Sequence, residues 1–290
     1  MKMYGLLRII PKNHLSYVVG WLVNRPLPRP LSTWSVRIFA WLFGIDTQAA
    51  LKPLNQYSCI GAFFVRDLKS DCRPIASGFV SPVDGTLREH GPVENGCLPQ
   101  IKGKKYSIKD LLLNADLTTK YNGGYFFNFY LSPQDYHHVH SPVSGSIVAG
   151  AHIPGKLWPV NNWSVAYIDN LFPVNERIVA CIQSDFGLIT LVMIGATCVG
   201  KMSVTYDGYL SNQDLALIRE RPAKIDYKHY TNKLEVKAGD RIGTFNMGSS
   251  VVLLCEQLPP ALDRNGLLAN TPVKLNYGME LCKLSPQKSS

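Results

Sequence analysis

The first 45 residues contain no Asp or Glu, so one sign of charge is absent from this end of the chain. The same segment carries six of the nine excess positive charges of the sequence, namely Lys2, Arg8, Lys12, Arg25, Arg29 and Arg37. These cations alternate with aliphatic and aromatic clusters, whereas a nucleic-acid surface presents its basic residues as a polar stripe. The segment therefore favours an anionic membrane surface as its partner, and not a nucleic acid.

Long hydrophobic runs are also missing, because no stretch of 18 apolar residues occurs anywhere in the sequence. A helix needs about 20 such residues to cross a bilayer, so we predict no membrane-spanning helix. The seven cysteines include no CxxC pair, and their number is odd. This pattern argues against a disulfide framework and against a zinc ribbon, and it favours a reducing compartment. The 290 residues, 46% of them hydrophobic, suffice for a substantial folded core.

Apolar side chains recur at helical spacing after residue 30, at Leu31, Trp34, Ile38, Trp41, Leu42 and Ile45. Arg37 lies among them, a pattern typical of a helix in a membrane interface, with its apolar face in the acyl boundary. One alternative is an amphipathic helix packed on the protein's own core. Another is an organelle transit peptide, which the few serines and the large apolar share disfavour.

The sequence changes character after the connection FFVRDLKSDCRPI, residues 63–75. Short apolar runs rich in β-branched residues follow one another between Gly, Pro, Asn and Asp, which predicts strands and hairpins. Residues 185–187 are expected to form a hairpin turn, and residues 107–115 are the only clear internal helix, with Ser107 as N-cap. We therefore predict an α+β protein: a helical, membrane-associating N-terminus over residues 1–62 and a mainly antiparallel β-rich catalytic domain over residues 63–290.

Two stretches resemble each other, SPVDGTL at residues 81–87 and SPVSGSIV at residues 141–148. They either occupy related positions in a compact β-structure or share a common turn-strand pattern without further meaning. VKAGDRIG at residues 236–243 is similar to the turn of lipoyl- and biotinyl-type β-folds, so the β core is expected to have lipoyl/biotinyl-like features. No lysine stands at a hairpin tip as a carrier domain requires, which argues against a swinging arm.

The stretch RIGTFNMGSSVVLLCEQL, residues 241–258, reads as a buried strand that Gly248-Ser249-Ser250 interrupts. Glycine inside a strand marks a bulge or a close backbone approach, so these residues are expected to serve something other than sheet stability. Other candidate chemistry lies at Asp84 and in LSPQDYHHVHSPV, residues 131–143, which contains three histidines. An Asp, a His and a Ser on separate elements could form a nucleophilic triad.

The histidines of this segment are His137, His138 and His140. In an extended chain His138 and His140 share one face and His137 points to the other. Three histidines within four residues could also bind a metal ion, but the sequence offers no clear carboxylate or cysteine partner nearby. We therefore assign no metal site.

Several segments together resemble one family over nearly the whole chain, in this order: FFVRDLKSDCRPI, SPVDG, LSPQDYHHVHSPV, LFPVNERIV, MIGATCVGKM and MGSS. On these motifs the chain is similar to the phosphatidylserine decarboxylases, which make their own pyruvoyl cofactor by cutting themselves between Gly and Ser. The family's motif is most often Leu-Gly-Ser-Thr, and this chain has Met247-Gly248-Ser249-Ser250. The serine at position 250 keeps the hydroxyl.

The resemblance implies a role for each matching residue. Ser249 would be the nucleophile and the precursor of the pyruvoyl group, with Gly248 on the other side of the cut. Cleavage would leave a beta chain of residues 1–248 and an alpha chain of residues 249–290, held together as a heterodimer. Asp84 and His140 would be the orienting acid and the general base of self-cleavage. His137 would serve decarboxylation, as proton donor or phosphate ligand, and His138 would be structural or exposed.

The implied activity is that of a lyase of phospholipid biosynthesis, a zymogen that matures by autocatalytic cleavage. It would decarboxylate phosphatidylserine to phosphatidylethanolamine and carbon dioxide through a Schiff base with the pyruvoyl group. The resemblance also implies a homodimer and a peripheral protein on the cytoplasmic face of the cell membrane. The alternatives are a non-catalytic, lipoyl-like binding module on a membrane-attached base, or the same chemistry on another amino-acid head group.

Overall fold

The computed structural model describes residues 12–100, 104–197, 201–209, 225–246, 249–257 and 271–282. The helices are α2 (Lys12–Val23), α3 (Leu31–Phe43), the 3-10 helix η1 (Leu54–Gln56), α4 (Ile60–Phe64), α5 (Ile108–Leu112), α6 (Ala115–Lys120), α7 (Asn162–Tyr167) and α8 (Leu171–Val174). The strands are β1 (Phe79–Val80), β2 (Gly85–Pro92), β3 (Cys97–Gln100), β4 (Lys104–Ser107), β5 (Tyr125–Leu131), β6 (His138–His140), β7 (Gly145–Ile153), β8 (Arg177–Ser184), β9 (Gly187–Ile194), β10 (Met202–Val204), β11 (Asp226–Val236), β12 (Arg241–Phe245), β13 (Ser249–Cys255), β14 (Val273–Leu275) and β15 (Glu280–Cys282).

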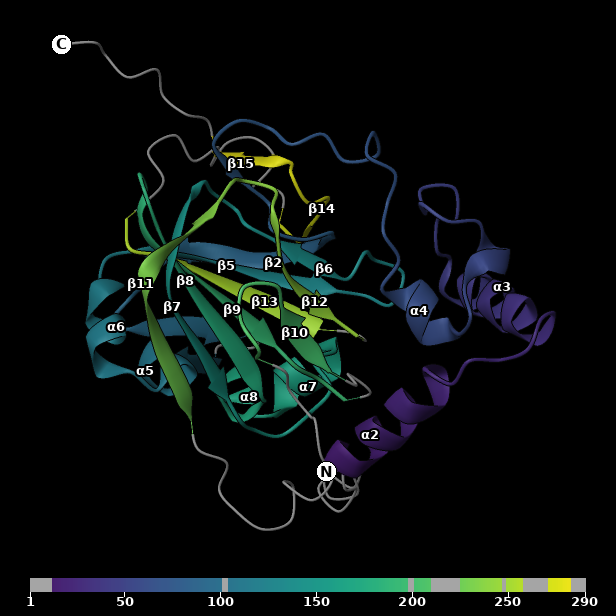
Figure 1. Ribbon diagram of the computed structural model, residues 1–290. Helices are drawn as coiled ribbons and strands as arrows, with labels where there is room; N and C mark the ends of the chain where they lie inside the picture. Colours follow the sequence, from purple (N-terminus) through teal and green to yellow (C-terminus); the bar gives the residue numbers. More distant parts are fainter. Residues whose placement is uncertain are drawn as a thin grey trace.

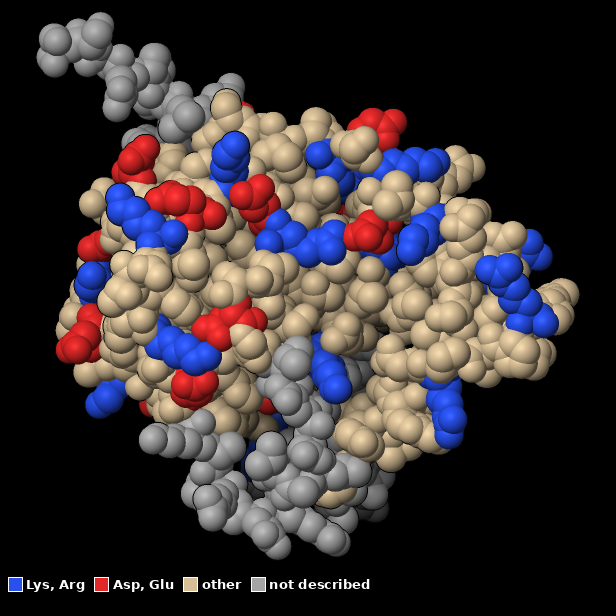
Figure 2. Space-filling model, in the orientation of Figure 1, with Lys and Arg blue, Asp and Glu red and all other residues tan. Residues whose placement is uncertain are grey.

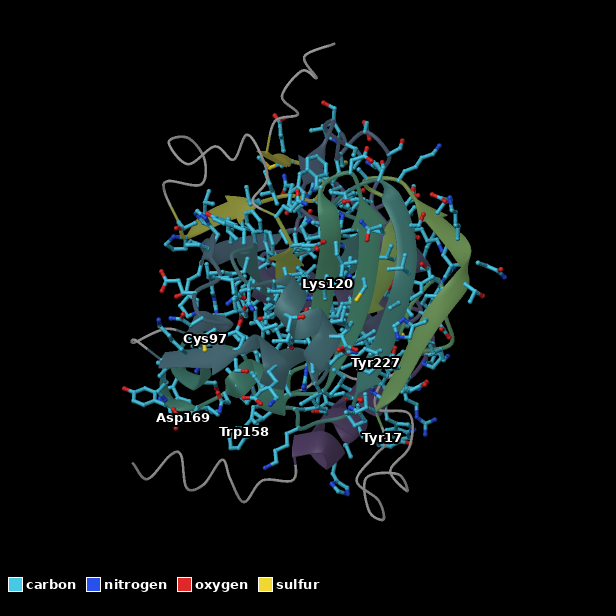
Figure 3. All side chains as sticks on the ribbon, turned by 90° about the vertical axis from the view of Figure 1, so that its left-hand side faces the viewer. Tyr17, Cys97, Lys120, Trp158, Asp169 and Tyr227 are labelled. Carbon is cyan, nitrogen blue, oxygen red and sulfur yellow. The ribbon has the colours of Figure 1, made fainter. Side chains whose placement is uncertain are left out.

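A large antiparallel sheet of eight strands forms the body of the protein, in the order β11-β7-β8-β9-β13-β5-β2-β14 (Figure 1). A three-stranded sheet, β10-β12-β6, and the pairs β1-β15 and β3-β4 complete the strands of the described chain. The short helices α5 to α8 pack their apolar side chains into the same core as the large sheet. The edge strand β11 reaches α5 through the Tyr227 hydroxyl, which donates to the Leu112 carbonyl at 2.6 Å (Figure 3). The expected α+β class with an antiparallel β core is thus confirmed.

The two similar stretches, residues 81–87 and 141–148, do occupy related positions. In each stretch the serine hydroxyl donates to the carbonyl oxygen two residues later, at 2.9 Å from Ser81 and 2.6 Å from Ser141. Each stretch then continues into a long strand of the large sheet, β2 or β7. The likeness in sequence therefore reflects a repeated turn-strand unit.

The two units also pair with each other reciprocally. The Val80 amide donates to the Pro142 carbonyl and the His140 amide donates to the Pro82 carbonyl, both at 2.8 Å. Because position 80 corresponds to 140 and position 82 to 142, the two hydrogen bonds are related by an approximate two-fold axis. The axis places the N-terminal ends of β2 and β7 beside each other.

A glycine turn packs against each unit in the same way. The Gly278 amide donates to the Ser81 carbonyl at 3.0 Å, and the Gly239 amide donates to the Ser141 carbonyl at 2.9 Å. Both glycines have positive φ, +82° and +88°, a conformation that side-chain-bearing residues rarely adopt. The turn in residues 236–243 thus has an equivalent near the C-terminus.

Helices α2, α3 and α4 form a lobe at one side of the large sheet (Figure 1). Helix α3 turns Ser32, Val36 and Ala40 inward, and the last two pack with Tyr57 and Phe63 in a small second core. Its opposite face is exposed, and Trp41 has 80% of its surface open to solvent. Leu31, Trp34, Ile38 and Leu42 share this face. The predicted apolar face therefore does not pack on the protein's own core.

Ile45 departs from the predicted face, because it is only 7% exposed and joins the second core. The reason is that α3 ends at Phe43 and Gly44 takes a left-handed conformation, so Ile45 no longer follows the helical spacing. On the face shown in Figure 2 the outer part of the lobe is mostly uncharged, with Lys or Arg and no Asp or Glu at its edge. Within the described residues, no helix is both long enough and apolar enough to cross a membrane.

Helix α4 joins the lobe to the β core. Phe63 belongs to the second core, whereas the Phe64 ring lies against the His137 ring, with centroids 4.0 Å apart. The expected boundary between residues 62 and 63 falls inside this helix, so α4 is shared by the two regions. A change in the position of the lobe would therefore act directly on His137.

Two local expectations can be compared with the structure. The hairpin turn at residues 185–187 is confirmed, since Ser184 pairs with Gly187 between β8 and β9. The helix expected over residues 107–115 begins as predicted, with the Ser107 side chain accepting from the Asp110 amide, but it ends at Leu112 because Leu113 has a positive φ. The statement that it is the only clear internal helix is wrong, because α6, α7 and α8 follow; each is six residues or shorter, too short for a periodic pattern.

Candidate active site

Ser249 is the first residue of β13, which lies in the middle of the large sheet between β9 and β5. All seven residues of β13 are buried, and Ser249 itself is 0% exposed. Its hydroxyl oxygen has no hydrogen-bond partner. A buried hydroxyl without a partner is costly, so a function must retain it. Met247 and Gly248, the expected neighbours at the cut, lie outside the described residues.

The chain changes sheets just before Ser249. Strand β12 belongs to the three-stranded sheet and ends at Phe245, whose amide donates to the His137 carbonyl at 2.9 Å. The next amide, of Asn246, donates to the Lys201 carbonyl at 2.9 Å. The expected single interrupted strand is therefore two strands, and Ser249-Ser250 begins the second instead of interrupting the first. Both sides of the predicted cut are held by backbone hydrogen bonds.

His137 precedes β6 and is fully buried. Its Nδ1 donates to the Asp135 carbonyl at 2.8 Å, so in the neutral ring Nε2 is the basic nitrogen, and it has no partner. Burial lowers the pKa of His137 to about 3, and the charge of Arg66 acts in the same direction. The ring is therefore neutral near pH 7, with one free nitrogen.

His140 ends β6 and is held in a similar way. Its Nδ1 donates to the Gly239 carbonyl at 2.6 Å, and its Nε2 is buried without a partner. The ring stacks on Tyr277 with centroids 3.9 Å apart and planes within 8°. Burial lowers the pKa of His140 to about 4. Near pH 7 it is a neutral base in a fixed orientation, which is the state that a general base requires.

His138 differs from both neighbours, because both of its ring nitrogens have partners. Its Nδ1 lies 2.7 Å from the Thr244 hydroxyl and its Nε2 lies 3.1 Å from the Val65 carbonyl. His138 is thus buried and fully hydrogen-bonded, and its structural role stays a prediction. His138 and His140 both lie against the Tyr136 ring whereas His137 lies against α4, as the alternation along an extended chain predicts. Among the described side chains, no three or more His, Cys, Asp or Glu gather as metal ligands.

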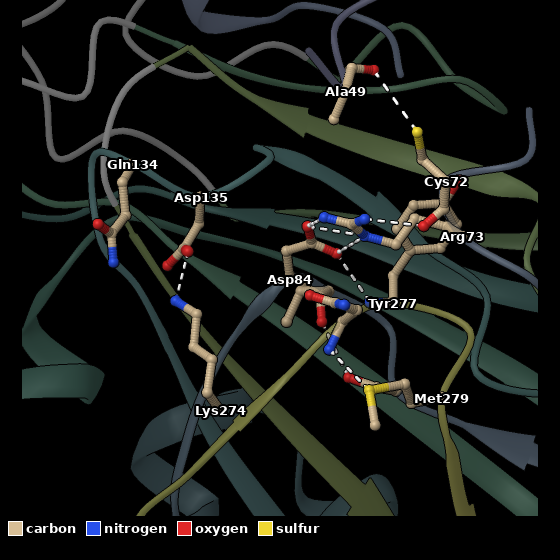
Figure 4. Close-up of polar contacts among 12 residues, drawn as sticks. Ala49, Cys72, Arg73, Asp84, Gln134, Asp135, Lys274, Tyr277 and Met279 are labelled. Carbon is tan, nitrogen blue, oxygen red and sulfur yellow. Dashed lines mark hydrogen bonds and ion pairs between the residues drawn. The ribbon is translucent and has the colours of Figure 1, made fainter. Parts of the chain in front are cut away.

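Asp84 is 4% exposed and makes a bidentate ion pair with Arg73 (Figure 4). Arg73 Nη2 lies 2.6 Å from Asp84 Oδ2, and Asp84 Oδ1 also accepts from the Tyr277 amide at 2.8 Å. No hydrogen bond joins Asp84 to His140, although both residues are described. The two meet through Tyr277, whose amide is bound by Asp84 and whose ring carries His140.

The internal repeat shows which contacts of Asp84 the fold itself requires. Position 84 corresponds to Ser144, whose hydroxyl accepts from the Ala238 amide at 3.0 Å just as Asp84 accepts from the Tyr277 amide. A neutral serine therefore suffices to hold the glycine turn. The negative charge of Asp84 and its pairing with Arg73 exceed what the fold requires at this position.

Sequence reasoning did not find Arg73 or Tyr277 as residues of the site. Arg73 lies in FFVRDLKSDCRPI, the first of the matching segments, which was the available signal. Tyr277 lies in no matching segment, and only the pairing of its turn with residues 81–87 brings it to the site. Its importance depends on a long-range contact that spacing along the chain does not reveal.

A cavity of about 550 Å³ is lined in part by Asn246, two residues before Gly248. Tyr17, Trp21 and Arg25 line it from the region of α2, and Lys201 and Asn246 line it from the β core. It therefore connects the helical lobe with the chain that leads to Ser249. The two cations at its wall suit a ligand with negative charge.

Comparison with known proteins identifies the family of this chain. The family model of phosphatidylserine decarboxylase matches residues 60–282. Phosphatidylserine decarboxylase proenzymes from Anaeromyxobacter sp. (strain K) and Myxococcus xanthus are 39% and 36% identical to this chain, over 89% and 87% of it and 90% and 88% of their own lengths. The proenzyme of Legionella pneumophila (strain Lens) is 32% identical over 94% of this chain and 95% of its own length. The chain belongs to the phosphatidylserine decarboxylase family, and it is an enzyme.

The buried histidines predict a loss of stability in mild acid. Their pKa values lie at about 3 for His137 and about 4 for His138 and His140, against 6.5 in an unfolded chain. Between pH 6.5 and 4 the unfolded chain binds more protons than the folded one, so acidification favours unfolding. The urea midpoint should be lower at pH 5 than at pH 7, and the decline should be shallower in His138→Gln. An equal decline in this variant would contradict the assignment.

Proposed function

We propose that this enzyme converts phosphatidylserine to phosphatidylethanolamine and carbon dioxide, with a pyruvoyl group that forms from Ser249 by self-cleavage after Gly248. The observation that carries this proposal is the fully buried Ser249 hydroxyl without a hydrogen-bond partner, placed where the chain passes from β12 to β13. Membership of the family supports it. The products of cleavage are a beta chain, residues 1–248, and an alpha chain, residues 249–290.

Self-cleavage begins when Ser249 Oγ attacks the carbonyl carbon of Gly248. The new C–O bond forms as the peptide C–N bond breaks, so the acyl group moves from nitrogen to oxygen as an ester. Loss of the Ser249 Cα proton then breaks the Cβ–Oγ bond and releases residue 248 as a carboxylate. The dehydroalanine left at position 249 takes up water and loses ammonia, which gives the pyruvoyl group. The buried hydroxyl fits this chemistry, because no other hydrogen bond competes for it.

His140 is the base that we propose for the first step. Its neutral ring has a free Nε2, and its orientation is fixed by the Gly239 carbonyl and by the Tyr277 ring. It would take the proton of Ser249 and pass it to the departing nitrogen. Asp84 would act as a positioning residue through Tyr277, not through a direct hydrogen bond to the histidine.

His137 is the residue that we propose for decarboxylation. Once bound to the substrate amine, the pyruvoyl carbonyl supplies the electron sink for the loss of carbon dioxide. The carbon that loses the carboxylate must then receive a proton, and His137 Nε2 is a buried nitrogen free to carry it. The alternative is that His137 binds the phosphate of the lipid. The cations Arg25 and Lys201 in the cavity beside α2 would attract the charged head group.

The lipid must reach this site from a bilayer, because a two-tailed lipid is nearly absent from water. The exposed apolar face of α3 and the acid-free N-terminal segment support peripheral attachment, which we place at the cytoplasmic face of the cell membrane. The reciprocal pairing of residues 81–87 and 141–148 supports the lipoyl/biotinyl-like character of the β core. The homodimer implied by the family stays a prediction.

A pair of variants tests the proposed function. Ser249→Ala should give a single intact chain without activity, because the nucleophile and the only source of the ketone are lost. His137→Ala should mature into two chains, the smaller with a blocked N-terminus by mass spectrometry, yet release no carbon dioxide from phosphatidylserine. Two chains from Ser249→Ala would exclude cleavage at this residue, and an uncleaved His137→Ala would assign that histidine to maturation. An intact wild-type chain would favour the non-catalytic binding module.

The internal repeat provides a sharp test of Asp84. Asp84→Ser installs the residue that the equivalent position already holds, so the hydrogen bond to the Tyr277 amide and the fold should persist. Self-cleavage should nevertheless slow, by up to about 10²-fold, because a serine without the ion pair to Arg73 holds the Tyr277 turn, and with it the His140 ring, less firmly. The control is Ser144→Ala, which should lower stability and leave the cleavage rate unchanged. Cleavage of Asp84→Ser at the wild-type rate, followed by gel, would remove the carboxylate from the mechanism.

Attachment through α3 is tested by replacing Trp34 and Trp41 together with Asp. Both side chains are exposed, so folding and self-cleavage should persist while binding to anionic vesicles falls at least about tenfold, since burial contributes roughly 25 cal/mol per Å². Leu113→Asp, at an exposed site on α5's C-terminal side, is the matched control and should bind normally. Sedimentation of the double variant with vesicles at the wild-type level would show that the membrane contact lies elsewhere.

A further inference from the structure

The two glycine turns of the internal repeat match each other residue by residue. One turn covers residues 237–240 and the other residues 276–279. In each turn the amide of the fourth residue donates to the carbonyl of the first, at 3.0 and 3.2 Å. In each, the side chain of the fourth residue also accepts from the amide of the first, through a carboxylate at 2.7 Å or the Met279 sulfur at 3.2 Å. Tyr277 therefore corresponds to Ala238.

An alanine thus suffices at this position of the turn, and the tyrosine ring exceeds what the turn requires. The backbone has the same task in both turns. The Tyr277 amide donates to Asp84 at 2.8 Å (Figure 4), and the Ala238 amide donates to the Ser144 hydroxyl at 3.0 Å. Neither hydrogen bond involves the side chain of the donor residue. The ring of Tyr277 therefore needs an explanation other than the fold of the turn.

The Tyr277 ring lies flat on the His140 ring, with centroids 3.9 Å apart and planes within 8°. His140 corresponds to Val80, so the related pair consists of alanine and valine where this one consists of tyrosine and histidine. Tyr136 packs against both rings, with centroids 5.7 Å from His140 and 5.3 Å from Tyr277. Under this cover the imidazole is only 5% exposed.

The stacking supplies what the hydrogen bond of His140 leaves open. The Nδ1 of His140 donates to the Gly239 carbonyl at 2.6 Å, which fixes one atom of the ring but not the plane of the ring. Its Nε2, the nitrogen proposed to take the proton of Ser249, has no partner. The direction in which Nε2 points is therefore set by the packing of the ring, and Tyr277 makes the closest of its ring contacts.

We propose that the Tyr277 side chain is a positioning residue for self-cleavage, whose ring fixes the plane of the His140 imidazole and keeps water from it. The inference rests on the proposed role of His140 as the base. Tyr277 follows the predicted cut, so it belongs to the proposed alpha chain, whereas His140 belongs to the beta chain. The base is therefore complete only once the C-terminal turn has docked on residues 81–87.

The described groups around the imidazole are of two kinds, charged and neutral. Burial, the largest cause, lowers the pKa of His140 to about 4. The charge of Arg241 on β12 acts in the same direction, whereas Asp240 and the hydrogen bond to Gly239 raise this pKa. The neutral titratable groups nearby are His138, whose pKa is about 4, and the hydroxyls of Tyr136 and Tyr277, whose pKa values are raised by burial.

Removal of the Tyr277 ring should raise the pKa of His140, because water would reach the imidazole and burial would disfavour its charged form less. A base with a higher pKa is protonated, and therefore inactive, at a higher pH. Loss of packing elsewhere in the turn would lower stability without moving this pKa. The pH dependence of self-cleavage therefore distinguishes a positioning role from a purely structural one.

The test follows self-cleavage by gel in full-length chain that is made by cell-free synthesis and then shifted to pH 8 or pH 5. Tyr277→Ala installs the residue of the equivalent turn, so the fold should persist while cleavage slows about 10²-fold at pH 8. At pH 5 the deficit should grow by a further factor of about two to ten, because less of the base is neutral. If this variant fails to fold, Tyr277→Leu takes its place.

Two further variants serve as controls. Tyr277→Phe keeps the ring and should cleave at the wild-type rate at both pH values. Met279→Ala removes the sulfur acceptor of the same turn but keeps the ring and the amide of Tyr277. It should lower stability and retain the wild-type pH dependence of cleavage.

A second measurement does not depend on cleavage. In Ser249→Ala, which should stay intact, nitrogen-15 NMR follows the protonation and the tautomer of His140, with the signals assigned by their loss in His140→Gln. Tyr277→Ala in this background should raise the pKa of His140 by about one unit or more and weaken the preference for a proton on Nδ1. Tyr277→Phe should change neither.

Cleavage of Tyr277→Ala at the wild-type rate overturns the proposal. So does an equal deficit at both pH values together with an unchanged pKa of His140, since that result shows a structural role only. A wild-type chain that never cleaves would instead refute the proposed function. In that case the NMR titration alone decides whether Tyr277 positions His140.

Discussion

One constraint governs this structure: a serine hydroxyl is buried and unpaired at the start of β13, a strand that is paired on both sides in the middle of a sheet. Ser249 can hold that position only because the chain is fixed on both sides of residues 247–248. Before it, Phe245 and Asn246 are bound to His137 and Lys201, and after it β13 is paired along its length with β5 and β9. The strand pairing in the two sheets thus offsets the free-energy cost of burying an unpaired hydroxyl.

The approximate two-fold repeat explains how the rest of the site is assembled. Both halves use the same serine turn and the same glycine turn, but each residue that we propose for the chemistry occupies only one partner of its related pair. Asp84 corresponds to Ser144, and His140 corresponds to the apolar Val80. Ser144 in one half and Val80 in the other show what the fold requires at these positions. The difference between the halves, a carboxylate and an imidazole on opposite sides of Tyr277, is therefore attributable to chemistry.

The sequence indicates candidate residues of the site but not the contacts between them. Local patterns located the exposed face of α3, the hairpin before Gly187 and the cap at Ser107, because each depends on neighbours within a few residues. Spacing failed at Ile45, where a left-handed glycine ends the helix. It also failed to predict that Asp84 pairs with Arg73 and reaches His140 only through Tyr277, since these contacts join segments far apart in the chain. Long-range pairing of strands cannot be read from local periodicity.

The candidate site and the helical lobe are in direct contact, and helix α4 joins them. Its two phenylalanines face different cores: Phe63 packs beneath α3, and Phe64 covers the His137 ring. Residue 66, directly after this helix, places its guanidinium against the backbone that orients His137. A bilayer that displaces α3 would therefore change the packing around a buried, neutral histidine. Because little solvent is present in such a site, a shift of the Arg66 charge relative to His137 would change the pKa of the histidine with little screening.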